Sequence, residues 1–248
     1  MTIGHQPSPN EAPADPGRTP GSTDEGLTAE VGQRLADTLR PLKPKLRGWL
    51  HVGWTPLALI SGLILVIGAP TDQGRIGGAV FMIGALLLFG TSAVYHRFTW
   101  GPTADTVLRR IDHSNIFVFI AATYTPLALM LLSGASRAAL LTIVWVAATC
   151  GLLFRVLWLS AARWLYTALY LLMGWAALGW LNQFWAAGGP LIFSLIVAGG
   201  LCYTLGAIVY ARKRPDPSPR WFGFHEIFHL TTLVGSGCHY AAIALATF

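Results

Sequence analysis

The chain has 248 residues, of which 54% are apolar and only 11% are charged, and ten are tryptophans. This composition is typical of integral membrane proteins and excludes an ordinary soluble domain. The formal net charge of +6 does not indicate nucleic-acid binding, because the basic residues lie in short segments between apolar runs.

The first 48 residues differ from the rest of the chain. Residues 1–26 are rich in Pro, Gly, Ser, Thr and acidic residues, so we expect a disordered tail without a cleavable signal peptide. Residues 27–48 carry apolar side chains four apart among basic residues. This pattern fits either a short amphipathic helix lying on anionic lipid or a basic juxtamembrane segment. Residues 49–248 form the expected membrane domain.

Seven apolar runs in this domain are long enough to cross a bilayer, since a crossing takes roughly 20 residues of helix. We expect them near residues 49–69, 76–96, 110–132, 138–158, 164–183, 189–211 and 223–247. Most Arg and Lys residues between the runs fall on one side, and the other side has only Arg75 and Arg137. The positive-inside rule therefore makes the N-terminus cytoplasmic and, with seven crossings, the C-terminus external. The predicted fold is all-α, a seven-transmembrane-helix bundle in the cell membrane.

The last run begins with His225-Glu226-Ile227-Phe228-His229, an H-E-x-x-H pattern. Histidines four apart stack on one face of a helix, where both imidazoles can reach one divalent metal ion. Buried imidazole and carboxylate groups are costly in a bilayer, so their presence in an apolar run points to function. Glu226 faces about 100° away from His225 on a helix, which weakens it as a zincin-type general base.

Further polar residues fall at the same depth, near the predicted cytoplasmic ends of their helices. His96 ends the second run, Ser92 lies one turn before it on the same face, and Asp112 lies in the first turn of the third run. Three imidazoles and one carboxylate at one level form a ligand set suited to zinc. Asp112 either ligates the metal directly or holds a zinc-bound water, and the pattern leaves both open.

Each of these residues also has a plainer interpretation. His96 could cap its helix at the membrane interface, Asp112 could pair with Arg109 or Arg110, and Ser92 could serve helix packing. Their coincidence at one depth is what favours a metal site.

Three other histidines are expected to lie outside the site. His51 stands beside tryptophans and is interpreted as an interfacial anchor. His113 follows Asp112 directly and points off its helix face, so a loop or packing role is favoured. His239 lies roughly 15 Å deeper than His229, too far for the same metal.

Four stretches together resemble the bacterial hemolysin III family, the prokaryotic branch of the progestin and adipoQ receptor group. They are Ser92-Ala93-Val94-Tyr95-His96, Arg110-Ile111-Asp112-His113-Ser114-Asn115-Ile116, Thr123-Tyr124-Thr125-Pro126, and His225-Glu226-Ile227-Phe228-His229 with Gly235-Ser236-Gly237-Cys238-His239. The resemblance runs from about residue 45 to the end. It implies a seven-helix bundle with zinc held near the cytoplasmic face by His96, His225 and His229. Asp112 and Ser92 match the positions that support the zinc-bound water.

Bacterial members of the family usually carry a glutamate just before the first helix. Residues 45–51 hold no acidic residue, so no function can be transferred to them from the resemblance.

Three function classes remain open. The wider superfamily includes alkaline ceramidases, so the first class is a zinc-dependent hydrolase of lipid amides or esters that acts in membrane lipid homeostasis. Asp112 would serve as its general base and Ser92 as a hydrogen-bond donor to the oxyanion. A membrane lipid would insert its acyl chain into an apolar cavity between the helices.

The second class is a receptor-like membrane protein with a structural zinc, and the third is a pore-forming cytolysin. An open fourth zinc position favours hydrolysis, whereas a closed four-ligand site favours a structural role. The pore ranks lowest, because a pore needs polar residues along its length and these runs show polar groups at one end only.

The orientation can be tested by labelling single cysteines on intact cells. In a cysteine-free background, Thr103→Cys and Ser218→Cys should resist a membrane-impermeant maleimide, whereas Ser136→Cys should react, because the Lys and Arg distribution places only the last of these outside. Efficient labelling at position 103 from outside would reverse the orientation and move the metal site to the outer face.

Overall fold

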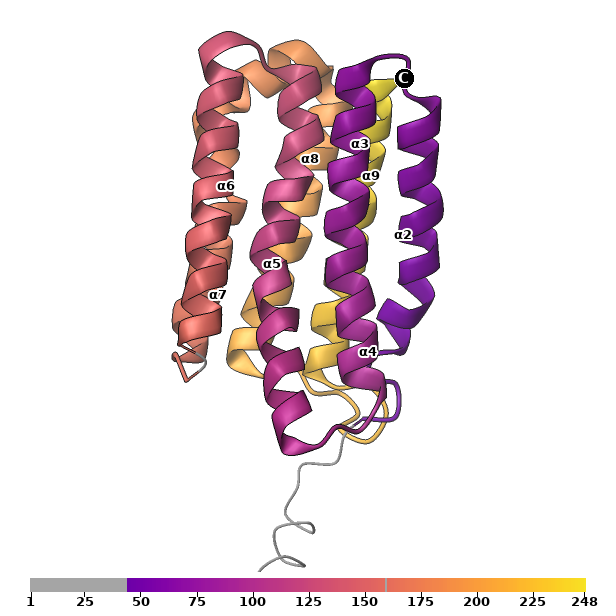
Figure 1. Cartoon of the computed structure of the whole chain (residues 1–248), viewed down its shortest axis with the longest axis vertical. Coiled ribbons are helices and arrows are strands. Elements are labelled where there is room, and N and C mark those ends of the chain that lie inside the picture. The colour runs from indigo at the N-terminus through magenta and orange to yellow at the C-terminus, as the bar shows by residue number, and fades with distance from the viewer. Residues whose placement is uncertain (1–43, 159) are drawn as a thin grey trace, which may run out of the picture. The chain divides into compact units, whose positions relative to one another are not determined.

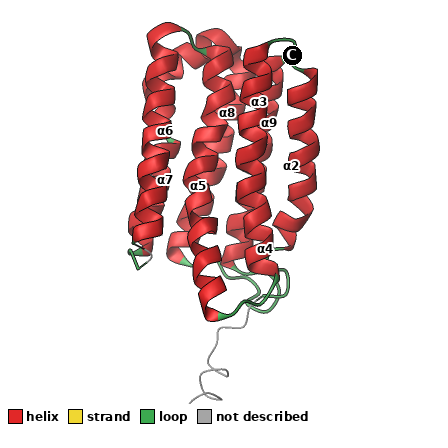
Figure 2. Cartoon of the chain, viewed as in Figure 1, coloured by secondary structure: helices red, strands yellow, loops and turns green. Residues whose placement is uncertain are grey.

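The computed structural model describes residues 44–158 and 160–248. These ranges fold into helices (Figure 2), and their only β-type pairing is an isolated bridge between Ser218 and Phe222. The predicted tail at 1–26 and most of the basic segment at 27–48 lie outside the described residues.

Six helical stretches among the described residues are long and apolar enough to cross a membrane, which makes this a multi-pass membrane protein. The first is α2 (Trp49–Gly68). The second is one continuous run of α3 (Asp72–Ala85), η1 (Leu86–Gly90) and α4 (Thr91–Arg97). The third and fourth are α5 (Pro102–Leu131) and α6 (Gly134–Leu157). The fifth runs from α7 (Arg163–Gly174) through η2 (Ala176–Trp180) to α8 (Leu181–Arg212), and the sixth is α9 (Phe224–Thr247).

The helices form a bundle, which confirms the predicted all-α membrane fold (Figure 1). In it α8 lies along α9, α5 contacts both α3 and α6, and α2 packs against α3. Segments distant in sequence are thereby brought together, since α9 also contacts α2 and α5.

The fifth stretch is too long for a single crossing. Its 50 residues would extend roughly 75 Å as one helix, more than twice the ~30 Å hydrocarbon core. The helix breaks at Gly189, whose φ of 67° lies in the left-handed region that favours glycine, directly before Pro190. The predicted run at 164–183 precedes this break and the run at 189–211 starts at it. The count of seven crossings and the orientation of the termini stay predictions.

The third membrane helix begins at Pro102, eight residues before the predicted start at 110. Proline fits the first turn of a helix, where its fixed φ is favourable and its missing N–H is not needed, and Asp105 in that turn complements the helix dipole. Asp112 therefore lies well inside α5, and the prediction that it occupies the first turn is wrong. Hydropathy detects only the apolar part of a helix, so the polar turns at its start were missed.

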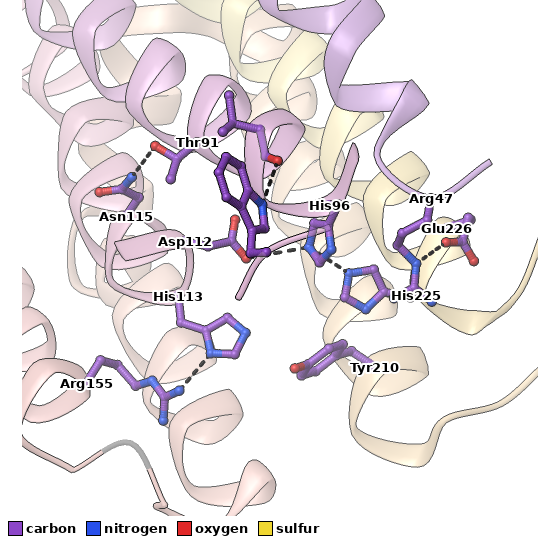
Figure 3. Close-up of polar contacts among 12 residues, drawn as sticks. Arg47, Thr91, His96, Asp112, His113, Asn115, Arg155, Tyr210, His225 and Glu226 are labelled. Carbon is purple, nitrogen blue, oxygen red and sulfur yellow. Dashed lines mark hydrogen bonds and ion pairs between the residues drawn. The ribbon is translucent and has the colours of Figure 1, made fainter. Parts of the chain in front are cut away.

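The second membrane helix contains a π-helical segment, Leu86–Gly90, between α3 and α4. At its end the Thr91 backbone N–H bonds the Leu87 and Leu88 carbonyls. Asn115 on α5 donates hydrogen bonds from its side chain to the Leu87 carbonyl at 2.8 Å and to the Thr91 hydroxyl at 3.0 Å, and Figure 3 shows the second of these. This contact stabilises the segment that leads directly into Ser92 and His96.

We expect Asn115→Ala to lower the thermal stability of the protein in detergent. The substitution removes two side-chain hydrogen bonds, to the Leu87 carbonyl and the Thr91 hydroxyl, and a hydrogen bond contributes about 0.5–1.5 kcal/mol of unfolding free energy. Asn182→Ala, at an exposed position of α8, is the matched control. Equal melting temperatures for Asn115→Ala and the wild type would show that this amide does not stabilise the π-helical segment.

Candidate metal centre

The three predicted histidine ligands come together at one end of the bundle. His225 and His229 lie in the first two turns of α9, and His96 lies in the last turn of α4. One ligand atom from each histidine lies within 4.8 Å of the others. The Nε2 atoms of His96 and His225 are 3.2 Å apart (Figure 3), and all three side chains are buried.

This spacing fits a metal ion. Zinc–nitrogen bonds are about 2.0–2.1 Å long, so two nitrogen ligands at a tetrahedral angle lie about 3.3 Å apart. The Nδ1 atom of His229 is buried without a hydrogen-bond partner among the described residues, and a buried imidazole that lacks partners is costly unless something else satisfies it. The histidine cluster is therefore compatible with metal binding.

Asp112 and Ser92 lie beside this cluster. The Oδ2 atom of Asp112 is 3.6 Å from Nε2 of His96, and Ser92 lines the same cavity as Asp112. Neither Arg109 nor Arg110, both within the described chain, forms an ion pair with Asp112. The structure thus brings all five predicted site residues together and does not support the salt-bridge interpretation of Asp112.

Glu226 is occupied by structural contacts. Its side chain has 0% exposure, and its carboxylate accepts hydrogen bonds from the Arg47 side chain and from the Gly223 backbone N–H (Figure 3 shows the Arg47 pair). These contacts close the first turn of α9 and pair the buried charge. The sequence argument against Glu226 as a general base agrees with them, although the Arg47 contact was not predicted.

The interpretation of His51 as an interfacial anchor is wrong. Its ring stacks on His229, with centroids 3.8 Å apart and an angle of 16° between the planes, and the residue is only 3% exposed. His51 lies on the inner face of α2, where the buried residues recur at helical spacing. They are His51, Ala58, Gly62 and Leu65. This periodicity could have identified His51 from the sequence.

His113 lies on the cavity wall inside α5, not in a loop. Nη2 of Arg155 is 2.7 Å from Nδ1 of His113 (Figure 3). Because a guanidinium only donates hydrogen bonds, Nδ1 of His113 accepts and the hydrogen of the neutral ring lies on Nε2. Arg155 lies within the predicted run at 138–158, near its expected cytoplasmic end. It is 1% exposed, in the last turn of α6, on the face that buries Leu140, Val144, Ala148 and Gly151.

A cavity of about 140 Å³ with a mainly apolar lining extends from the histidine cluster into the bundle. Along α5 the lining runs from Asp112 to Leu127, which is roughly 22 Å of helix. Thr123, Tyr203 and His239 line it far from the histidine cluster. Polar groups are therefore not confined to one end, and the sequence argument that ranked a pore lowest does not hold.

Residues 39–240 match the family model described as Haemolysin-III related. The chain belongs to the hemolysin III family. The Hemolysin-3 homolog of Bacillus subtilis (strain 168) is 35% identical over 206 residues, which cover 82% of this chain and 93% of that protein. Hemolysin-3 of Bacillus cereus is 30% identical over 73% of this chain and 80% of its own length.

The likeness extends beyond bacteria. The heptahelical transmembrane protein ADIPOR2 of Oryza sativa subsp. japonica is 32% identical over 66% of this chain and 79% of its own length. The hemolysin III membership predicted from four short stretches is confirmed, within the wider progestin and adipoQ receptor superfamily.

Each of the three histidines should be necessary for metal binding in this hemolysin III protein. We expect His96→Ala, His225→Ala and His229→Ala each to reduce the bound metal well below one ion per chain and to lower thermal stability in detergent. The reason is that each change removes one of three nitrogen ligands from a buried site. Elemental analysis of protein purified without chelator measures the metal.

His239→Ala is the control for the metal content of these variants, because His239 lies outside the histidine cluster. His51→Ala is unsuitable as a control, since its ring contacts His229. Full occupancy in His96→Ala would remove α4 from the site, and metal-free wild-type protein would remove the site altogether.

Proposed function

We propose that this protein is a zinc-dependent hydrolase of lipid amides or esters that acts in membrane lipid homeostasis. The observation that carries the proposal is the meeting of three histidines, a carboxylate and an elongated apolar cavity at one place. Structural zinc sites are usually closed by four protein ligands, whereas catalytic sites use three and keep one position open. The three-histidine cluster matches the catalytic pattern.

Three imidazole nitrogens are a donor set that suits zinc. His96 would bind from α4 and His225 and His229 from α9, so the ion would also tie together two helices that are distant in sequence. When bound, zinc supplies Lewis acidity and makes an attached water acidic near neutral pH.

The remaining chemistry belongs to the side chains around the cluster. Asp112 lies next to His96, where it can orient the attacking water and take its proton. Ser92, on the same cavity wall, donates a hydrogen bond to the oxygen on which negative charge develops. Water is thereby added across the acyl C–N or C–O bond, which releases a fatty acid together with an amine or an alcohol.

The cavity defines the substrate class. Its mainly apolar lining excludes water and buries an acyl chain, while its polar end positions the scissile bond beside Asp112 and Ser92. The substrate is therefore a membrane lipid whose chain enters the bundle and whose head stays at the histidine cluster. By the positive-inside argument, the cluster faces the cytoplasm.

Reconstitution into lipid vesicles separates this proposal from a pore. Protein in vesicles that contain N-acyl and ester lipids should release fatty acid, detected by mass spectrometry, without releasing a trapped dye. A zinc chelator should stop the reaction, and added zinc should restore it. Dye release without fatty acid release would favour the cytolysin, whereas full zinc occupancy with neither activity would favour a receptor-like protein.

Asp112→Asn should keep the metal bound but lower the hydrolysis rate by roughly 10²–10⁴-fold, the usual contribution of a general base. Asp72→Asn is the matched control, because the Asp72 side chain is 92% exposed. Glu226→Gln should keep the rate but reduce the melting temperature, since it removes the ion pair with Arg47. The hydrolysis rate and the metal content are measured for each variant. An equal loss of activity in Glu226→Gln and Asp112→Asn would contradict the assignment of Asp112 as the general base.

A further inference from the structure

Tyr203 on α8 and His239 on α9 form a second polar pair on the cavity wall, away from the metal centre. Their ring centroids are 5.4 Å apart, and both residues line the cavity. His239 follows His225 by 14 residues, which places it about 40° from the same helix face and roughly 21 Å along the helix axis. One elongated cavity therefore connects the histidine cluster with this pair.

Two glycines make room for the two rings. A Cβ atom at Gly199 of α8 would lie 2.5 Å from the His239 ring, and a Cβ atom at Gly235 of α9 would lie 2.9 Å from the Tyr203 ring. Any larger residue at either position would displace a ring. Each helix thus accommodates the aromatic ring of the other at a glycine, and both rings pack in the interface between α8 and α9.

The hydrogen bond of His239 determines which of its nitrogens remains available. Nε2 lies 3.1 Å from the Ile196 carbonyl oxygen, and a carbonyl only accepts, so Nε2 carries the hydrogen. The imidazole is 9% exposed and packs between apolar helices, which favours its neutral form. Nδ1 is then a hydrogen-bond acceptor.

Two polar atoms of the pair form no hydrogen bond of normal geometry within the described part of the chain: Nδ1 of His239 and the Tyr203 hydroxyl, which lies near the Ser236 side chain. By contrast, Tyr124, Tyr170 and Thr204 on the same cavity donate their hydroxyl hydrogens to backbone carbonyls. An acceptor next to a phenol is the complement of an aliphatic hydroxyl group, which can donate to Nδ1 and accept from the phenol.

We propose that Tyr203 and His239 form a second ligand subsite, which binds a hydroxyl group on the chain of the lipid. The inference rests on the proposed function for one point, that the head of the lipid lies at the histidine cluster. A hydroxyl group near the distal end of the chain satisfies both polar atoms, a keto group there accepts from Tyr203 alone, and an unsubstituted chain leaves both unpaired. Affinity should fall in that order.

Binding to the full-length protein in detergent tests the subsite without turnover. The competitors of a fluorescent fatty acid are stearate, stearate with a hydroxyl near its methyl end, stearate with a keto group near its methyl end, and stearate with a hydroxyl next to the carboxyl group. The distal hydroxyl should bind about tenfold more tightly than stearate, because it satisfies polar groups that are otherwise buried unpaired. The keto compound should fall between them, and the hydroxyl next to the carboxyl group should give no gain.

Tyr203→Phe removes only the hydroxyl group, so it should abolish the gain of the keto compound and reduce that of the distal hydroxyl, which can still donate to Nδ1 of His239. The metal content should not change. Tyr240→Phe, which removes a hydroxyl outside the cavity lining, should keep both gains. Equal binding of stearate and its distal hydroxyl derivative by the wild type would overturn the subsite, and so would a gain of the keto compound that survives in Tyr203→Phe.

The binding series also separates this subsite from the hydrolase. A clear preference in a protein that releases no fatty acid would overturn the proposed function and support the subsite. Hydrolysis without any preference would overturn the subsite alone, and failure of all four compounds to bind would overturn both.

Discussion

A polar group inside an apolar helix bundle must find its partner within the protein, because no water surrounds it there. Several buried polar groups at the histidine end meet this requirement through contacts between helices or with the segment before α2. Glu226 pairs with Arg47, Arg155 contacts His113, and the Asn115 side chain contacts the Leu87 carbonyl. These contacts stabilise the surroundings of the cavity.

The same requirement identifies positions where a ligand belongs. The rings of His229 and His239 each keep a buried nitrogen without a partner among the described residues. One of these histidines belongs to the metal centre, and the other lies deep on the wall of the same cavity. A lipid that reaches both positions would have its reactive group at one end of the cavity and its chain recognised at the other.

The sequence was sufficient for the membrane bundle and for the meeting of His96, His225 and His229. Long apolar runs indicate spans, and the position of a residue relative to the end of its span gives its depth. The depth of a residue does not show, however, which way its side chain faces. His51 and Arg155 both stand near span ends, where a side chain can face either the lipid headgroups or the interior. Only the helical spacing of buried neighbours shows that both face inward.

Other features depended on contacts that no local pattern records. The π-helical segment at Leu86–Gly90 is stabilised by Asn115, 24 residues from Thr91 in sequence. The pairing of Arg47 with Glu226 joins residues 179 apart. Such contacts follow from the packing of helices, so periodicity and hydropathy could not predict them.

The π-helical segment lets the second membrane helix hold one residue more than a regular α-helix without changing the direction of the residues that follow. A π turn contains about one residue more than an α turn, and both turns cover the same full rotation. Loss of one residue between Leu86 and Gly90 would therefore convert the segment into an α turn and leave Ser92 and His96 directed toward Asp112 and His225. Between this segment and His96 the helix is regular, so one residue more or fewer there would rotate His96 by about 100° away from its partners. The length of the second membrane helix is thus adjustable at the π-helical segment and fixed beyond it.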